Sequence, residues 1–395
     1  MIYDIIIIWA WAAWLFAWIN TPKNLNKLIL EKNDKPWIKV LLSWGERANV
    51  SNMNIEPERD YFTQNKKSLL SVFKKYNQWD IMSFFASVWV NIVEEDRGRL
   101  ILESGDSKEL LAVLLRELKK NNCDLRVKQD VKKIIPLSLP FPSGEKGVEQ
   151  NVAASLPWGE TERGIFEIVV ENWEKYHTKN VIVSTGWKSF FQVWTTWEWY
   201  NFAREMWINI ITPYRTLCGM STKRDLSEIS WVSSDLDMSL LDKNSKNTIY
   251  REVWPMLFTH FWISWPIVHN LSNSIWEYLN KLWLEEELFE KYILDNLSLK
   301  LVFDIEKTPK RLVKFFELSE QNIEIILELQ NWRSWKEAKA TWGWIDMNEL
   351  DKNMQSKKYP WLYFIWEVVD ITGKTWGFNL QWAWSSAYVC SKSFD

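Results

Sequence analysis

The sequence predicts an α/β fold, and three observations in the first 31 residues support this prediction. Residues 4–8 read D-I-I-I-I, a β-branched run typical of a strand buried on both faces of a parallel sheet. Residues 9–14 then read W-A-W-A-A-W, and a second apolar segment at 28–30 ends at Glu31. This order of strand, turn, helix and acid-terminated strand is that of a nucleotide-binding β-α-β unit.

The composition shows an excess of tryptophan and a deficit of glycine. The 395 residues include 30 tryptophans and only 12 glycines, which is roughly 3% glycine where about 7% is usual. With its three tryptophans read as glycine, the run at 9–14 becomes G-A-G-A-A-G, which matches the dinucleotide-binding fingerprint in position and spacing. Glycine is needed there because the chain turns tightly, a pyrophosphate approaches the backbone and the helix packs closely on the strand.

Tryptophan recurs where other turns are expected. Trp187 follows an expected strand, Trp265 precedes a proline, and residues 194–200 and 341–344 read W-T-T-W-E-W-Y and T-W-G-W. Glycine adopts positive φ in such turns without steric cost. We therefore interpret most of the tryptophans as glycines, encoded by UGA codons that the source organism reads as glycine. If the tryptophans are genuine, the phosphate site is blocked and the chain is non-catalytic.

Charge, cysteine content and the N-terminus limit the class of protein. The net charge of −3, from 48 basic and 51 acidic residues, predicts neither a nucleic-acid partner nor a membrane-surface role. Three separated cysteines form no disulfide framework or zinc motif, so a reducing, cytoplasmic location and no metal site are expected. The apolar N-terminal run of about 15 residues is shorter than a membrane span and follows an acidic residue rather than a basic segment.

The remaining elements are predicted from hydrophobic periodicity. Helices are expected at 69–76, 81–88, 108–120, 285–294 and 309–318. Strands are expected at 125–127, 131–135, 165–170, 180–184 and 362–365. Residues 136–162 contain several prolines, glycines and serines and predict a surface loop, whereas short alternating segments at 188–271 indicate a β-rich domain. Residues 342–395 are expected to return to strand and turn.

Five blocks of residues, spread over nearly the whole chain, point to one family. They are W-A-W-A-A-W at 9–14, L-L-S-W-G-E-R-A-N-V at 41–50, residues 184–200, L-F-T-H-F-W-I-S-W-P at 257–266, and residues 361–386. With tryptophan read as glycine, the chain resembles the bacterial FAD-binding flavoproteins of the aminoacetone-oxidase-like family, which includes the bile-acid-inducible flavoprotein. That family is a branch of the glutathione-reductase-like flavoproteins.

The resemblance implies a discontinuous Rossmann-like FAD-binding domain with two insertions. The FAD-binding domain would comprise residues 1–187 plus 342–395. A β-barrel-like, substrate-side domain would comprise 188–271 plus 322–341, and a small helical insert would span 272–321.

The resemblance also implies which residues contact FAD. The fingerprint would cradle the pyrophosphate, Glu31 would bind the adenosine ribose, and a helix N-terminus near residue 377 would face the flavin ring, where it stabilises negative charge. The implied contacts are Trp9, Trp11, Ala12, Ala13, Trp14, Glu31, Ser43, Trp44, Gly45, Arg47, Asn49, Val131, Thr185, Gly186, Trp187, Trp366, Glu367, Asp370, Trp376, Gly377, Phe378 and Asn379.

The sequence departs from the family pattern at two positions. Ala48 stands where cysteine is common, which removes any thiol role there, and Phe378 stands where tyrosine is common. Trp382 and Trp384 match tryptophans of the family and are expected to be genuine. Neither reading is assigned to Trp79 or Trp158.

The predicted function is that of an FAD-dependent oxidoreductase, which transfers hydride or electrons between a small organic substrate and NAD(P)H or O₂. His260 lies in a matched block and is the candidate acid or base, although a structural, hydrogen-bonded histidine is the alternative. Two alternative functions would also use a bound flavin: the protein could modify RNA, or it could be the redox partner of another protein.

Overall fold

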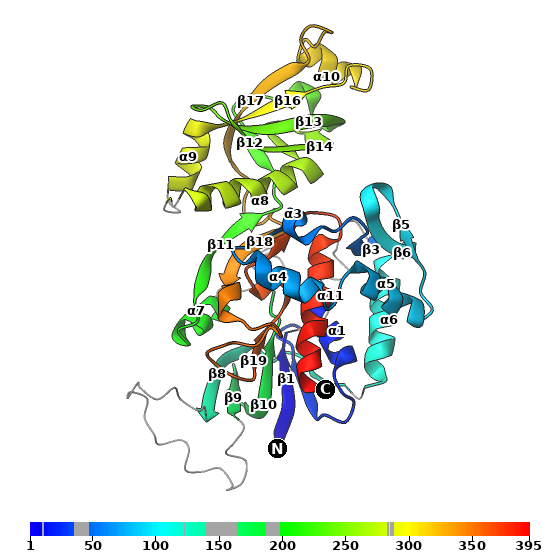
Figure 1. The fold of residues 1–395 in the computed structure, drawn as a ribbon, viewed down its shortest axis with the longest axis vertical. Helices are drawn as coiled ribbons and strands as arrows, with labels where there is room; N and C mark the ends of the chain where they lie inside the picture. Colours follow the sequence, from blue (N-terminus) through cyan, green and yellow to red (C-terminus); the bar gives the residue numbers. More distant parts are fainter. Residues whose placement is uncertain are drawn as a thin grey trace. The chain divides into compact units, whose positions relative to one another are not determined.

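The computed structural model describes most of the chain as two compact units (Figure 1). Unit 1 comprises Met1–Trp187, Val193–Thr212 and Gly343–Asp395, and unit 2 comprises Lys188–Gln192 and Pro213–Trp342. The described residues are 1–9, 12–34, 47–121, 123–138, 164–186, 198–282, 284 and 288–395. The predicted surface loop at 136–162 therefore lies almost wholly outside them.

A seven-stranded sheet forms the centre of unit 1. Its order is β7-β2-β1-β10-β9-β8, with β19 paired to β10. The parallel strands are β1 (Ile2–Ile8), β2 (Lys27–Leu30), β7 (Asp124–Arg126), β10 (Lys175–Val183) and β19 (Leu362–Phe364). The antiparallel strands are β8 (Val131–Ser138) and β9 (Ile165–Val170). The four consecutive isoleucines at 5–8 in β1 are fully buried, as a central parallel strand requires.

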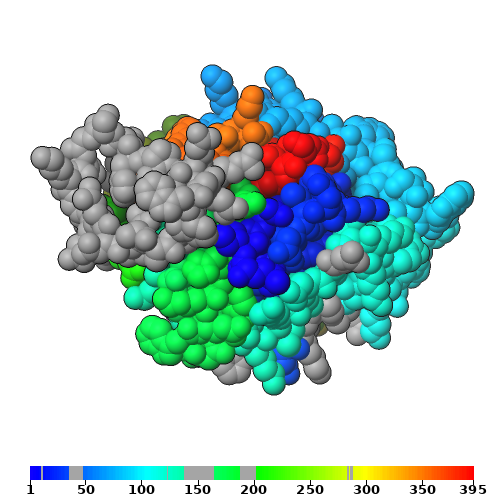
Figure 2. Space-filling view, turned by 90° about the horizontal axis from the view of Figure 1, so that it is seen from below, coloured from blue at the N-terminus to red at the C-terminus, as the bar shows by residue number. Residues whose placement is uncertain are grey.

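Helices pack beside β1. Helix α1 (Ala12–Asn20) contacts α11 (Phe378–Ser391) and α6 (Ser107–Lys119). Seen from below, the surface of the N-terminal segment lies beside α11, in red, and β9–β10, in green (Figure 2). The expectation of strand and turn across 342–395 is wrong for α11. Its Gln381, Ser385 and Ser386 are buried together with its apolar residues, so no single apolar stripe marks the helix in the sequence.

The smaller elements of unit 1 include two of the predicted helices. Helices α4 (Lys66–Phe73) and α5 (Gln78–Ser87) each begin three residues before the predicted start, because Asn65 and Asn77 cap them. The others are β3 (Arg47–Asn52), α3 (Pro57–Asp60), β4 (Tyr61–Phe62), β5 (Ile92–Glu94), β6 (Arg99–Asp106), α7 (Glu198–Glu205) and β20 (Thr372–Gly373). Strands β11 (Ile210–Thr216) and β18 (Ala340–Ile345) form a two-stranded sheet where the chain passes between the units.

In its described residues, unit 2 is a closed six-stranded antiparallel barrel with three α-helices. The barrel strands in spatial order are β12 (Met220–Thr222), β15 (Trp262–Ser264), β14 (Thr248–Phe258), β13 (Val232–Asp242), β16 (Leu297–Val302) and β17 (Glu324–Trp332). The helices are α8 (Pro266–Lys281), α9 (Phe289–Asn296) and α10 (Lys310–Phe315).

The predicted fold class, a Rossmann-type α/β domain with a barrel, is confirmed. Residues 272–321, expected as a helical insert, contain the C-terminal part of α8, all of α9 and α10, and also β16, which is a strand of the barrel. Among the described residues, no helix is both long and apolar enough to cross a membrane.

Candidate cofactor-binding site

The turn after β1 has the geometry that the fingerprint predicts. Trp9 has φ 69° and is buried, and its backbone N–H donates to Leu30 O at 2.8 Å. Ser184 Oγ donates to Trp9 O at 3.1 Å. Helix α1 then begins at Ala12, followed by Ala13 and Trp14, all of them buried. The backbone is therefore left-handed at residue 9, directly after a central strand and shortly before the N-terminus of a helix.

The end of β2 lies beside this turn. Glu31 is buried, and its Oε1 accepts from the backbone N–H and the side-chain amide of Asn33, both at 2.8 Å. Gln129 N donates to Glu31 O, which brings the start of β8 and the buried Val131 to the same edge. The sheet therefore gathers three of the predicted contacts: Trp9, Glu31 and Val131.

The segment after β10 joins the same edge. Val183 is paired with Ile8, and Ser184 N donates to Ile8 O at 3.2 Å. Thr185 is buried and Gly186 has φ 66°. Ser184 was not among the predicted contacts, although its place directly after a buried strand in the S-T-G run was a signal for it.

The C-terminal contacts surround the start of α11. Asn52 Nδ2 donates to Trp376 O at 3.2 Å, and Ser51 Oγ donates to Gln381 Oε1 at 2.6 Å, so β3 lies against this helix. Asn379 Oδ1 accepts from Gly373 N at 2.9 Å. Gly377 has φ 100° and caps the helix, whose N-terminus provides a partial positive charge.

The other predicted contacts of this region lie on the same elements. Asn49 is a buried residue of β3. Trp366 and Glu367 lie in a short 3₁₀ helix, and Trp382 Nε1 donates to Trp366 O at 3.0 Å. Buried Asp370 accepts from Gln64 N at 3.2 Å. Phe378 is the first residue of α11, and its carbonyl accepts from the Tyr61 hydroxyl at 2.7 Å.

Several predicted contacts fall outside what the structure describes. These are Trp11, Ser43, Trp44, Gly45 and Trp187, together with the side chain of Arg47, the first residue of β3.

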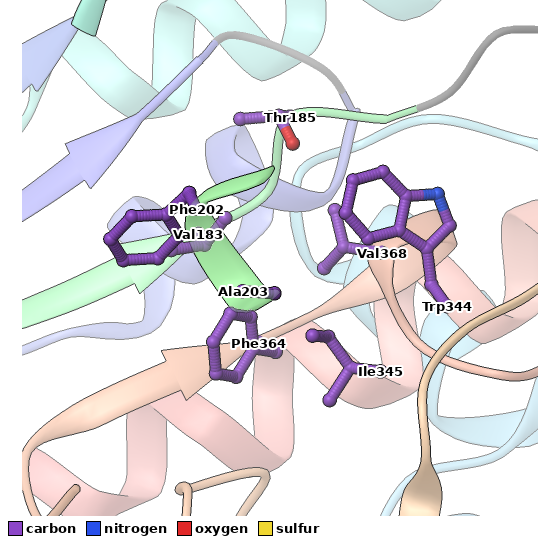
Figure 3. Close-up of a pocket in the computed structure, with 8 residues that line it drawn as sticks. All are labelled: Val183, Thr185, Phe202, Ala203, Trp344, Ile345, Phe364 and Val368. Atoms are coloured by element: carbon purple, nitrogen blue, oxygen red, sulfur yellow. The ribbon is translucent and has the colours of Figure 1, made fainter. Parts of the chain in front are cut away.

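A cavity of about 200 Å³ lies within unit 1 beside these contacts (Figure 3). It is lined by Val183, Thr185, Phe202, Ala203, Trp344, Ile345, Phe364 and Val368. The Trp344 indole and Val368 lie across it from the aromatic rings of Phe202 and Phe364 (Figure 3). Only about 10 Å³ of this space can hold the centre of a water-sized sphere, which is the lower limit for one water molecule, so the cavity is too small for a dinucleotide.

The backbone at many tryptophans is that of glycine. Of sixteen described non-glycine residues with positive φ, ten are tryptophan: Trp9, Trp89, Trp173, Trp207, Trp231, Trp265, Trp344, Trp361, Trp366 and Trp376. Trp265 is the extreme case, because its φ of 78° and ψ of 178° fall in a region essentially reserved for glycine. Bulky residues adopt positive φ only rarely.

The main chain of this site fits FAD, but the tryptophan side chains do not. The left-handed turn, the buried acid and the capped helix are the parts that a dinucleotide needs. The indole of Trp9, however, lies with its ring centre 5.4 Å from Lys32 Nζ, directly after Glu31. This indole is buried at the turn, where the fingerprint requires a residue without a side chain.

His260 belongs to unit 2, whereas the described FAD contacts belong to unit 1. It is exposed in the turn between β14 and β15, and its Nδ1 lies 3.4 Å from Ser230 Oγ. Across the described ranges, no group of three or more His, Cys, Asp or Glu side chains is arranged to hold a metal ion.

The fold is that of a Rossmann-type protein, and the main chain at this sheet edge has the parts that a dinucleotide needs. The chain belongs to the family described as "HI0933-like protein Rossmann domain", whose model matches residues 3–393.

Two relatives are similar to this chain over almost the whole length of both sequences. The chain is 26% identical over 421 residues to the ribosomal RNA dihydrouridine synthase of Escherichia coli, covering 99% of this chain and 97% of the relative. It is 26% identical over 424 residues to the Haemophilus influenzae protein of the same name, with 99% and 98% coverage. Its fold is similar to that of a 3-ketosteroid delta1-dehydrogenase from Sterolibacterium denitrificans, with a TM-score of 0.51, 10% identity and 99% coverage of both chains.

Proposed function

We propose that this protein is an FAD-dependent oxidoreductase that reduces uridine in RNA to dihydrouridine. The observation that supports the RNA substrate is the similarity, over 99% of the chain, to two proteins named ribosomal RNA dihydrouridine synthase. Dihydrouridine differs from uridine by two hydrogens across the C5–C6 bond of the base. The reaction therefore needs a hydride at one carbon and a proton at the other.

The residues of unit 1 would bind and orient the cofactor. A bound reduced flavin supplies the hydride, with NAD(P)H as the reductant that renews it. The left-handed turn at residue 9 and the N-terminus of α1 would hold the pyrophosphate, and Glu31 would accept hydrogen bonds from the ribose. The N-terminus of α11 would stabilise negative charge on the ring.

The proposal includes glycine at the tryptophan positions that block this site. The ten left-handed tryptophans support it because their backbone conformation costs glycine nothing. Trp382 and Trp384 support it differently: they lie inside α11, and their indole N–H groups donate to Trp366 O and Val50 O at 3.0 and 2.8 Å. The gene sequence tests this reading, with UGA codons expected at the ten positions and UGG at 382 and 384; UGG throughout would refute it.

The chain's net charge favours a second candidate, the small organic substrate with NAD(P)H or O₂ as the electron partner. A charge of −3 provides no general attraction for the RNA backbone. In this case NAD(P)H oxidation or O₂ consumption would depend on a small molecule and not on RNA.

One experiment separates the two candidates. The full chain with glycine at the ten positions and at Trp11, Trp14 and Trp187 is incubated with FAD, NADPH or NADH, and ribosomal RNA that lacks dihydrouridine. The RNA nucleosides are then analysed by mass spectrometry. Uridine gaining two hydrogens, only when protein and reductant are present, is the expected result. Unchanged RNA with protein that holds FAD would overturn the RNA assignment.

A further inference from the structure

An exposed surface of the barrel combines arginine guanidinium groups with aromatic rings. In the turn between β14 and β15, the Phe261 side chain is 48% exposed. The Arg333 guanidinium, directly after β17, lies 5.2 Å from the centre of the Phe261 ring. Backbone hydrogen bonds fix the turn, because Leu226 N donates to His260 O at 2.7 Å and Thr222 N donates to Phe261 O at 2.9 Å.

A second arginine–aromatic pair includes Arg224, which lies in the segment whose backbone N–H groups donate to this turn. The Arg224 guanidinium lies 4.7 Å from the centre of the Phe315 ring, and it donates to Phe315 O at 3.4 Å. Arg311 of α10 donates to the carbonyls of Glu228 and Ser230. Because Ser230 Oγ also contacts the His260 ring, these residues form one connected surface.

We propose that this surface binds the single-stranded part of the RNA substrate. We call it the arginine–aromatic surface and define it by Arg224, His260, Phe261, Arg311, Phe315 and Arg333. The inference rests on the proposed function, since it presumes an RNA substrate. None of the six residues is a tryptophan, although the Arg333 guanidinium also lies 4.4 Å from the centre of the Trp262 ring.

The chemistry of the surface matches the features that proteins use to bind single-stranded RNA. Unpaired bases stack on aromatic rings and on guanidinium planes, and phosphates bind arginine. A guanidinium already lying beside a ring is pre-oriented for both contacts. Two carboxylates of this surface already have partners, because Glu337 accepts from Arg333 at 2.7 and 2.9 Å and Asp225 accepts from Ser227.

This local surface also reconciles an RNA substrate with the overall acidity of the chain. Net charge averages over the molecule, whereas RNA affinity depends on the few cations that contact phosphate. His260, in the middle of the surface, would then contact RNA.

The test measures RNA affinity of the glycine-restored full chain by fluorescence anisotropy, with a labelled single-stranded uridine-rich oligonucleotide and a salt series. Phe261→Ala is expected to weaken binding roughly five- to hundredfold through lost stacking. Arg224→Ala and Arg333→Ala should each weaken binding and reduce the slope of log affinity against log salt by about 0.7. Arg333→Lys should keep the slope and lose affinity, because it retains charge without a stacking plane.

Matched controls are Lys281→Ala and Lys291→Ala, which remove exposed cations from α8 and α9 in the same unit. They should bind RNA as the parent does. Bound FAD absorbance and the thermal unfolding midpoint of each variant show whether it is folded.

The outcomes separate the inference from the proposed function. Folded variants that lose RNA affinity while keeping FAD would support the inference. A parent chain that binds and reduces RNA, with arginine and phenylalanine variants that bind equally well, would overturn the inference and leave the proposed function intact. A parent that holds FAD but neither binds nor reduces RNA would overturn both.

Discussion

At the scale of single residues, the ten left-handed tryptophans have a backbone conformation that favours glycine. Trp173 illustrates this: it lies in the β9–β10 turn with φ 67°, after Asn172, and its N–H donates to Val170 O at 2.9 Å. Read as glycine, the pair is Asn-Gly, the sequence most typical of a hairpin. The turn keeps a glycine-like geometry even with tryptophan at this position.

Because a positive φ costs free energy in any residue other than glycine, replacement by glycine should have opposite effects on stability at two exposed tryptophans. Trp173 is 76% exposed, so Trp173→Gly loses little burial and relieves left-handed strain; we expect the free energy of unfolding to rise by about 0.5–1 kcal/mol. The matched control is Trp79, which is 58% exposed but lies in helix α5, where Trp79→Gly should lower that free energy by about 0.5 kcal/mol. Denaturant unfolding measures both; equal signs would contradict the account.

A buried histidine predicts a pH dependence of stability. Burial lowers the pKa of His269 to about 3, and the nearby Lys339 cation adds to this. The unfolded chain, with a histidine pKa of about 6.5, then binds a proton that the folded chain does not, so stability is complete above pH 6.5 and falls as the pH decreases toward 3. The slope approaches about 1.4 kcal/mol per pH unit.

Urea unfolding at a series of pH values measures this contribution. His269→Gln should remove it, whereas His260→Gln, at an exposed position of the same unit, should leave the profile unchanged. A parental slope that persists in His269→Gln would show that another group is responsible.

At the scale of elements, the placement of α11 depends on one close approach. A Cβ added to Gly377 would lie 2.1 Å from Ser51 O in β3, and its φ of 100° disfavours any other residue. Gly377→Ala should therefore lower the free energy of unfolding by about 2–4 kcal/mol and weaken FAD binding, as α11 moves from β3.

Gly105 provides the control for this prediction. It has φ 68° but nothing within 4 Å of an added Cβ, so Gly105→Ala should cost only the conformational penalty, about 1 kcal/mol, and leave FAD affinity unchanged. Calorimetry and FAD titration of the two variants measure this difference. Equal losses of stability would contradict the close approach to Ser51.

Elements with a strong local signal were predictable, and elements defined by tertiary contacts were not. The isoleucine run of β1 and the leucine face of α6 are local patterns, and both elements form at the predicted positions. Strand β16 has only six residues and lies between helical segments. Its pairing with β13 and β17 in the barrel therefore could not be predicted from the local sequence pattern. Helix α11 is buried on all sides and shows no amphipathic period.

In the candidate site, too, some features were predictable from the local sequence and others depend on tertiary contacts. The turn at Trp9 and the acid at Glu31 follow from a fingerprint of fixed spacing. The contact of Gly377 with Ser51 joins residues more than three hundred positions apart, and the hydrogen bonds of Asn379 to the turn at Gly373 require the folded chain. Such contacts are set by how the elements pack, which periodicity does not describe.

At the scale of the whole molecule, we assign the proposed FAD binding to the Rossmann-type unit and the proposed RNA binding to the barrel unit. Unit 1 contains the described residues that we predict to contact FAD, and unit 2 contains the proposed arginine–aromatic surface. The oxidoreductase proposal depends first on unit 1, because uridine reduction needs a bound flavin. Cofactor binding is therefore the property on which the remaining proposals depend.

The most direct measurement is the visible absorption spectrum of two purified full chains after incubation with FAD and gel filtration. One chain carries tryptophan at all of these positions. The other carries glycine at the ten left-handed positions and at Trp11, Trp14 and Trp187. We predict flavin bands at about one FAD per glycine-restored chain and none for the chain with tryptophans, because the fingerprint needs glycine at positions 9, 11 and 14 for the turn and the close approach of the pyrophosphate. A folded, glycine-restored chain that remains colourless would contradict the account.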